Sequence, residues 1–112
     1  MKYVLLILSL FLLASCQSQE NPNNLSKETG VFSLDTSEIF IEDDTIYFRE
    51  GMTQEEFLSD IIARDESVQT YRFLTNDGSV KTRQELFEYE KLEVISEDGV
   101  YKKVYTLFYI TN

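Results

Sequence analysis

The chain of 112 residues carries 20 acidic and 10 basic side chains, no histidine, and a formal net charge of −10. So acidic a surface repels phosphate backbones, which excludes nucleic acid as an expected partner. With one cysteine and no histidine, the chain lacks both the ligands of a zinc site and a disulfide of its own, and we expect no metal and no cofactor.

The first residues have the pattern of an export signal. Lys2 supplies a positive start, an apolar run follows to Leu13, and the small residues Ala14 and Ser15 lead into Cys16. The apolar run is shorter than the roughly 20 residues that a permanent membrane span needs. A permanent anchor would therefore have to be something other than this segment.

The ending Leu13-Ala14-Ser15-Cys16 resembles the lipobox of bacterial lipoproteins. The resemblance implies cleavage before Cys16, a diacylglycerol on its sulfur and usually a third acyl chain on its amine. Two or more chains hold a protein firmly at a membrane, whereas one is marginal. In lipoproteins of this type an aspartate after the cysteine favours retention at the inner membrane, so the resemblance implies that Gln17 favours the outer membrane or the outer leaflet of the cell membrane. We expect an exported, lipid-anchored protein of the cell envelope; a plain secretory signal with an unrelated cysteine is the alternative.

Residues 17–30 are polar, contain the only proline and offer nothing for a core. This composition predicts a flexible tether that reaches roughly 20 Å. The chain is therefore divided into a signal peptide (1–15), a lipidated cysteine with its tether (16–32) and one small folded domain (33–112).

The folded part begins with a predicted hairpin and a helix. Glu38–Glu42 and Thr45–Phe48 are short β-rich runs joined by an acidic turn of two aspartates. Thr53 and Glu56 then have the spacing of a capping box. An apolar stripe carries the predicted helix through residues 57–64.

The second half of the chain predicts mainly strands. Gln69–Leu74 is followed by an Asn-Asp-Gly turn and a short strand, Ser79–Lys81. A second capping-box spacing predicts a short helical turn at 84–87. Lys91–Ser96 is a strand with its leucine and valine inward, and a Glu-Asp-Gly turn joins it to the long strand Val100–Ile110.

This order predicts an α+β domain, β-β-α-β-β-β-β, with one amphipathic helix over a small antiparallel or mixed sheet. The order is β-grasp-like with an extra terminal strand, and a β-sandwich is the alternative. Val100–Ile110 is apolar on both sides in its second half, which places it in the middle of the sheet.

Residues 51–107 are similar to a module of bacterial surface and secreted proteins. The matching pieces are Gly51-Met52-Thr53, Phe57-Leu58, Tyr71, Asp77-Gly78, Leu92-Glu93-Val94, Glu97-Asp98-Gly99 and Tyr105. Such modules usually act as spacers or accessory domains, several to a chain, whereas this chain has one copy. The resemblance implies an interaction or structural role.

No group of residues predicts catalysis. The chain lacks histidine, the most frequent general base near neutral pH, and its only cysteine, Cys16, is assigned to the lipid. Ser79 and Lys81 lie in a predicted turn region, where a buried, activated lysine is not expected. Asp43 and Asp44 are adjacent, so they do not flank a substrate as the two acids of a glycosidase do. We expect no enzyme, and solvated acidic turns rather than calcium sites.

The last strand presents the best candidate binding surface. In an extended strand Tyr101, Tyr105 and Tyr109 point to one side. If the helix covers the other side, the three tyrosines form an exposed row for sugar rings or a protein partner. If it does not, Tyr105 and Leu107 belong to the core.

Together these features favour a non-enzymatic envelope lipoprotein, a binding or structural module held at the cell surface or in the periplasm by a lipid anchor. The alternatives are a glycan-binding accessory lipoprotein that uses the tyrosine row, and an acidic inhibitor or exclusion lipoprotein directed at a basic partner.

Overall fold

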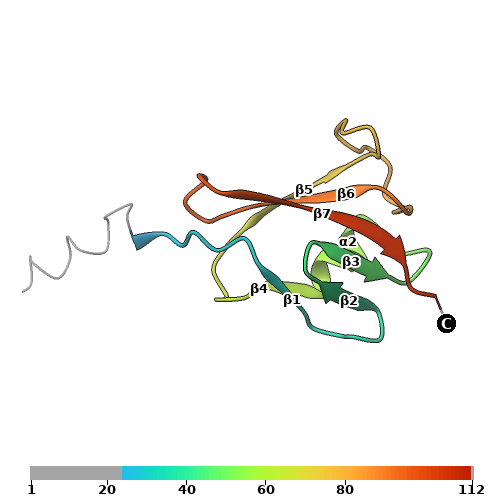
Figure 1. The fold of residues 1–112 in the computed structure, drawn as a ribbon, viewed down its shortest axis with the longest axis horizontal. Helices are drawn as coiled ribbons and strands as arrows, with labels where there is room; N and C mark the ends of the chain where they lie inside the picture. The colour runs from blue at the N-terminus through green and yellow to red at the C-terminus, as the bar shows by residue number, and fades with distance from the viewer. Residues whose placement is uncertain (1–23, 112) are drawn as a thin grey trace, which may run out of the picture.

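A computed structural model describes residues 24–111 of the chain. Its elements, labelled as in Figure 1, are β1 (Val31–Ser33), β2 (Ile39–Glu42), β3 (Thr45–Phe48), α2 (Gln54–Ser59), β4 (Ile61–Ala63), β5 (Thr70–Leu74), β6 (Lys91–Ile95) and β7 (Lys102–Tyr109). One short helix combined with strands in two sheets makes this an α+β fold, as the sequence predicts.

Five strands form the main sheet, in the order β2-β3-β7-β6-β5. β3 and β7 run parallel while the other neighbours are antiparallel, so the sheet is mixed and β7 lies at its centre, as predicted. β1 and β4 form a separate two-stranded antiparallel sheet. Figure 1 shows β1, β4 and α2 together on one side of β5, β6 and β7.

One apolar core fills the space between these two layers. β6 contributes Leu92 and Val94, which are predicted to point inward and are fully buried. Phe57 of α2 lies edge-on to Phe48 and Phe73, with ring centroids at 6.1 and 5.4 Å. The other buried members of the core are Val31, Ile39, Ile46, Met52, Ile61, Leu86, Tyr105 and Leu107.

Three predicted turns are confirmed by their backbone geometry. Asp43 has a φ of 54° between β2 and β3, and Gly78 and Gly99 have φ values of 92° and 76°. Glycine adopts such angles without the steric cost that a Cβ brings. Asp77 and Asp98 each accept the N–H two residues further on, at 3.0 Å, which closes the turns with side-chain hydrogen bonds.

The capping box is also confirmed, but the helix is shorter than predicted. The Glu56 N–H donates to the Thr53 hydroxyl at 3.2 Å, and the Glu56 carboxylate accepts the Thr53 N–H at 3.0 Å. The helix ends at Ser59 rather than near Arg64. Ile61–Ala63 instead forms β4 and pairs with β1, because this pairing buries Ile61 and Ala63 and gives the segment a partner strand.

Two short elements predicted between β5 and β6 do not form. Ser79–Lys81 makes only one bridge to β5 and is not a strand. Residues 84–87 form no helical turn, because the Leu86 N–H donates to the Met52 carbonyl at 2.9 Å and Gln54 pairs with the same segment. Leu86 is fully buried, so tertiary pairing outweighs the local capping signal.

Residues 26–30 are attached to the domain, so the folded part begins earlier than predicted. The Ser26 N–H donates to the Glu97 carboxylate at 3.0 Å, and the Gln69 amide donates to two carbonyls of this segment at 2.9 and 3.1 Å. The second half of the predicted tether is therefore part of the folded domain. Its first half, like the predicted signal peptide, falls in residues 1–23, outside the described residues.

Candidate functional site

Four aromatic side chains form a continuous row across the side of the main sheet that α2, β1 and β4 leave uncovered. Phe40 of β2 and Tyr47 of β3 have ring centroids 6.1 Å apart, and Tyr47 lies 6.0 Å from Phe108 of β7. Tyr89, in the turn before β6, meets Phe108 edge-on at 5.3 Å. We call these four residues the aromatic row.

The register of the sheet explains why the side chains meet. Phe40 is paired with Tyr47, and Tyr47 with Phe108, so the three side chains leave the sheet on the same side. Tyr89 joins them from a turn in which its φ is 71°, an uncommon angle for a large residue. Its N–H donates to the Leu107 carbonyl at 2.8 Å, which fixes the turn to β7.

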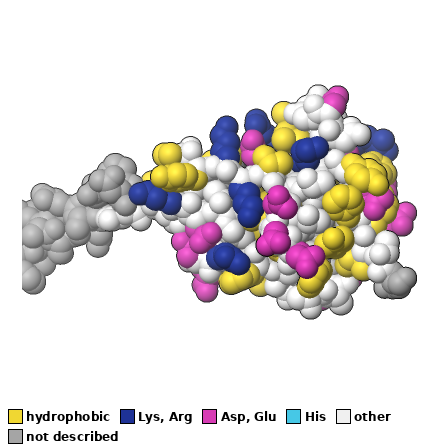
Figure 2. Space-filling model, in the orientation of Figure 1, with side chains coloured by type: hydrophobic (Ala, Val, Ile, Leu, Met, Phe, Trp, Pro, Cys, Tyr) yellow, Lys and Arg dark blue, Asp and Glu magenta, His cyan; other side chains and the backbone are white. Residues whose placement is uncertain are grey.

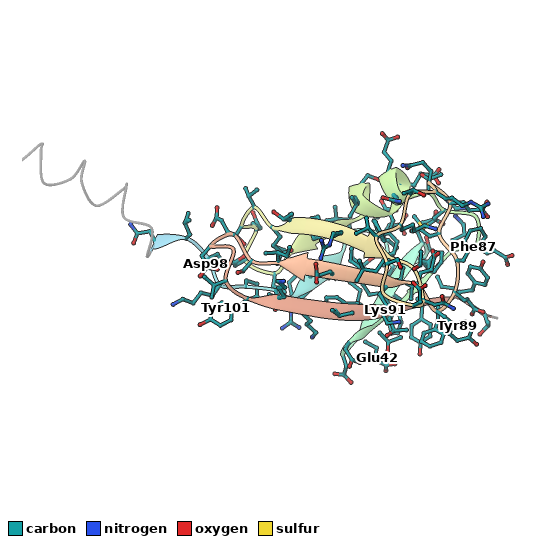
Figure 3. The ribbon with its side chains drawn as sticks, turned by 90° about the horizontal axis from the view of Figure 1, so that it is seen from above. Glu42, Phe87, Tyr89, Lys91, Asp98 and Tyr101 are labelled. Atoms are coloured by element: carbon teal, nitrogen blue, oxygen red, sulfur yellow. The ribbon has the colours of Figure 1, made fainter. Side chains whose placement is uncertain are left out.

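The aromatic row is exposed and lies far from the start of the described chain. Phe40 and Tyr89, at its two ends, are 48% and 57% exposed, and the two rings between them are partly buried. Figure 2 shows hydrophobic side chains gathered at the end of the domain away from the N-terminal segment, with acidic side chains among them. Figure 3 shows Tyr89 at that end and Tyr101 at the opposite end. Exposed apolar clusters of this kind often mark binding surfaces.

Charges are unevenly divided over this side of the sheet. The half formed by β5 and β6 carries Lys91 and the ion pair of Arg72 with Glu93, whose nitrogen and oxygen are 2.7 Å apart. The β2 end of the aromatic row carries Glu42, which alternation places on the same side as Phe40. The β2 end of the aromatic row therefore combines rings with a free carboxylate. On the same side Lys102 lies at the far end of β7, and Arg49, after β3, is paired with Glu38 at 2.7 Å.

A shallow pocket of about 520 Å³ lies at the β2 end of the aromatic row. Phe40, Tyr47 and Glu42 contribute to its lining. The other lining residues are Thr36, Ser37, Ile110 and Thr111. Neither lysine nor arginine is among them.

A larger hollow, of about 730 Å³, lies between the two sheets and is lined by side chains of both charges. Its lining includes Glu28 and Asp43 as well as Arg64 and Lys103. Both cations already lie over rings, Arg64 at 5.2 Å from the centroid of Phe32 and Lys103 at 4.8 Å from that of a buried tyrosine.

The predicted row of Tyr101, Tyr105 and Tyr109 is not an exposed surface. Tyr105 is 1% exposed, Tyr109 is partly buried, and Tyr101 alone is open, at 48%. The helix and the small sheet cover the tyrosine side of β7 and leave the Phe108 side uncovered, which reverses the expected orientation. The alternative that Tyr105 and Leu107 belong to the core is confirmed.

The aromatic row was not predicted from the sequence, although the sequence contains a signal for part of it. Phe40 and Tyr47 each lie two residues from a polar residue on the same side of the predicted hairpin, a pattern typical of a solvent-facing strand side. Bringing Phe108 beside them required the parallel pairing of β3 with β7, for which the sequence has no local signal.

Carboxylates gather around the end of β7 that lies near the aromatic row. Burial raises the pKa of Tyr109, and the carboxylates of Glu50, Glu85 and Glu88 raise it further. Glu88 also accepts the Tyr109 N–H at 3.1 Å. Three carboxylates therefore lie close to this end of β7.

Lys81 is buried, in contrast to the prediction of a loop lysine. Its side chain is 2% exposed, and its ammonium donates to the Glu90 carboxylate at 2.9 Å and lies 5.1 Å from the centroid of Phe87. Glu90 accepts the Phe87 N–H at 2.8 Å as well. Through these contacts the pair of Lys81 and Glu90 stabilises the connection between β5 and β6.

The lipobox residues Leu13, Ala14, Ser15 and Cys16 lie outside the described residues. Within residues 24–111 no helix has the length and apolar character to cross a membrane, and no three or more acidic or other metal-ligating side chains are grouped for a metal ion. Comparison of the chain with family models, curated proteins and solved structures finds no match. The function is therefore inferred from the residues themselves.

Proposed function

We propose that this protein is a non-enzymatic, lipid-anchored protein of the bacterial cell envelope whose domain binds a partner through the aromatic row. The observation that carries the proposal is the position of four contacting rings, two of them about half exposed, at the end of the domain opposite the N-terminal segment. A lipid on Cys16 would hold the N-terminal end near the membrane and present the aromatic row outward.

The path of the chain into the domain supports this orientation. The Ser26 carbonyl accepts the Asp98 N–H at 3.0 Å, so the chain enters the domain beside the turn between β6 and β7. β7 starts at Lys102, next to that turn, and Phe108 lies near its far end. At about 3.3 Å per residue, the strand carries the aromatic row roughly 20 Å beyond the entry point.

The residue types of the chain favour binding over catalysis. Histidine is missing from the sequence, and Cys16 is assigned to the lipid. Among the described residues, Lys81 is buried but its ammonium is engaged with Glu90. The exposed side chains of the aromatic row provide mainly apolar contact surface.

Mass spectrometry of the native protein tests the anchor. We expect the N-terminal peptide from the membrane fraction to begin at Cys16 and to carry the added mass of a diacylglycerol and acyl chain. A Cys16→Ser variant should remain unprocessed. An unmodified thiol, or a native product released into the medium, would contradict a lipid anchor.

Site-specific cross-linking in intact cells tests the binding surface. A photoreactive phenylalanine analogue replaces Tyr89 in one variant and Tyr101 in a matched control, since both are exposed tyrosines at opposite ends of the domain. We expect a discrete adduct from position 89 and none from position 101. Equal cross-linking at both positions, or none at 89, would show that the aromatic row is not a binding surface.

A further inference from the structure

We infer that the pocket at the β2 end of the aromatic row receives the cationic side chain, lysine or arginine, of a basic protein partner. The inference rests on the proposed function and deepens it, because it names the chemistry that the partner must carry.

The lining of the pocket combines the two kinds of group that attract an organic cation. Phe40 and Tyr47 are paired across neighbouring strands with their rings inclined by only 36° to each other. Glu42 follows Phe40 by two residues on β2, so its exposed carboxylate lies on the same side. Aromatic faces attract ammonium and guanidinium groups, and a carboxylate nearby adds a full opposite charge.

No cation of the described domain occupies this site. The acids of its three ion pairs are Glu38, Glu90 and Glu93, and the rings of its four cation contacts belong to Phe32, Phe87 and Tyr105. Elsewhere in residues 24–111, then, lysines and arginines do lie over rings. Both rings of the pocket and the Glu42 carboxylate are left without such a partner.

The electrostatics of the chain also favour a basic partner. Asp43 and Asp44 follow Glu42 in the turn, and the whole chain has a net charge of −10. A field of this sign speeds the encounter with basic proteins and repels acidic ones. In the larger hollow between the sheets, by contrast, Arg64 and Lys103 oppose a cation.

The test uses the full chain, purified from membranes in a neutral detergent and labelled with ¹⁵N for NMR. Hexalysine is the probe, with hexaglutamate and cellohexaose as comparisons. Glu42→Gln removes the charge of the pocket, and Glu55→Gln removes the same charge from the exposed face of α2 as a matched control. Phe40→Leu keeps an apolar side chain but removes a ring.

We expect hexalysine to shift the amide signals of Phe40, Glu42 and Tyr47, and hexaglutamate to leave them unchanged. Glu42→Gln and Phe40→Leu should each weaken hexalysine binding roughly two- to fivefold relative to Glu55→Gln, as expected for a cation–π contact at an exposed site. The difference between Glu42→Gln and Glu55→Gln should shrink as the salt concentration rises.

The alternative outcomes separate this inference from the proposed function. If Glu42→Gln and Glu55→Gln weaken hexalysine binding equally, the attraction is to the acidic surface as a whole. That result would overturn the inference that the pocket binds a cation. Shifts along the aromatic row with cellohexaose but not with hexalysine would make the row a glycan surface, which overturns the pocket and leaves the proposed function standing. Absence of both effects, together with no cross-link at Tyr89, would overturn both.

Discussion

The Tyr105 hydroxyl donates a hydrogen bond to the Thr29 carbonyl at 3.0 Å, across 76 positions of the chain. Tyr105 belongs to the central strand β7, whereas Thr29 belongs to the segment that the sequence predicts as tether. The bond therefore ties the N-terminal segment to the middle of the fold. Because of this connection, the proposed anchor would pull on the domain at its core and not on a loosely attached end.

Removing this hydroxyl should weaken the attachment. We expect Tyr105→Phe to lower the free energy of unfolding by about 1 kcal/mol, because one partly buried hydrogen bond is lost and the Thr29 carbonyl is left without this donor. Urea unfolding gives the size of the effect, and faster hydrogen exchange in residues 26–30 shows where it acts. Tyr101→Phe, at an exposed position, should change neither quantity.

The capping box should contribute measurably although the helix is short. Thr53→Ala removes the hydroxyl that accepts the Glu56 N–H, and we expect a loss of about 1 kcal/mol in the free energy of unfolding. Thr53→Ser keeps the acceptor and should retain most of the stability. Equal losses in the two variants would show that the threonine methyl, rather than the cap, is responsible.

The buried pair of Lys81 and Glu90 should be sensitive to the loss of one member. Lys81→Met leaves a carboxylate buried without its counter-ion, and we expect a loss of about 3–5 kcal/mol. The double variant with Glu90→Leu should recover part of it, although the Phe87 N–H then lacks its acceptor. Thermal and urea unfolding measure the stability of the single and the double variant. A single variant as stable as the native protein would contradict a stabilising role.

Stability should decline in acid through the turn aspartates. The pKa of Asp77 is lowered from 3.8 to about 2, chiefly because the Thr75 hydroxyl donates to its carboxylate, with Ser79 adding further hydrogen bonds. Since the unfolded chain binds this proton more tightly than the folded one, the stabilisation is complete above about pH 4 and disappears as the pH falls through 2. Serine neighbours lower the pKa of Asp35, Asp65 and Asp98 in the same direction.

Thr75→Val tests whether the Thr75 hydroxyl lowers the pKa of Asp77. Without the main donor, the pKa of Asp77 should rise towards 3.8, and its share of the acid sensitivity should move to higher pH. NMR titration of the Asp77 carboxyl carbon measures the pKa directly. A native Asp77 that already titrates near 3.8 would contradict the hydrogen-bonded turn.

Features that are stabilised by residues close together in the chain could be predicted from the sequence. The box of Thr53 and Glu56 closes over three residues, and the turn at Gly99 depends on the φ of one glycine. Leu92 and Val94 alternate with polar residues, so their inward direction follows from the period of a strand. Such signals were enough to predict an α+β fold with β7 at its centre.

Features that depend on distant partners become visible only in the folded domain. Ile61–Ala63 suits a helix or a strand equally, and the pairing with β1 selects the strand. β7 is apolar on both sides, so its own sequence cannot tell which side is covered. The packing of α2, β1 and β4 places Tyr105 inside and leaves Phe108 outside, where the register of three strands aligns it with Phe40 and Tyr47. Burial is a property of the assembled layers, and no segment carries that information alone.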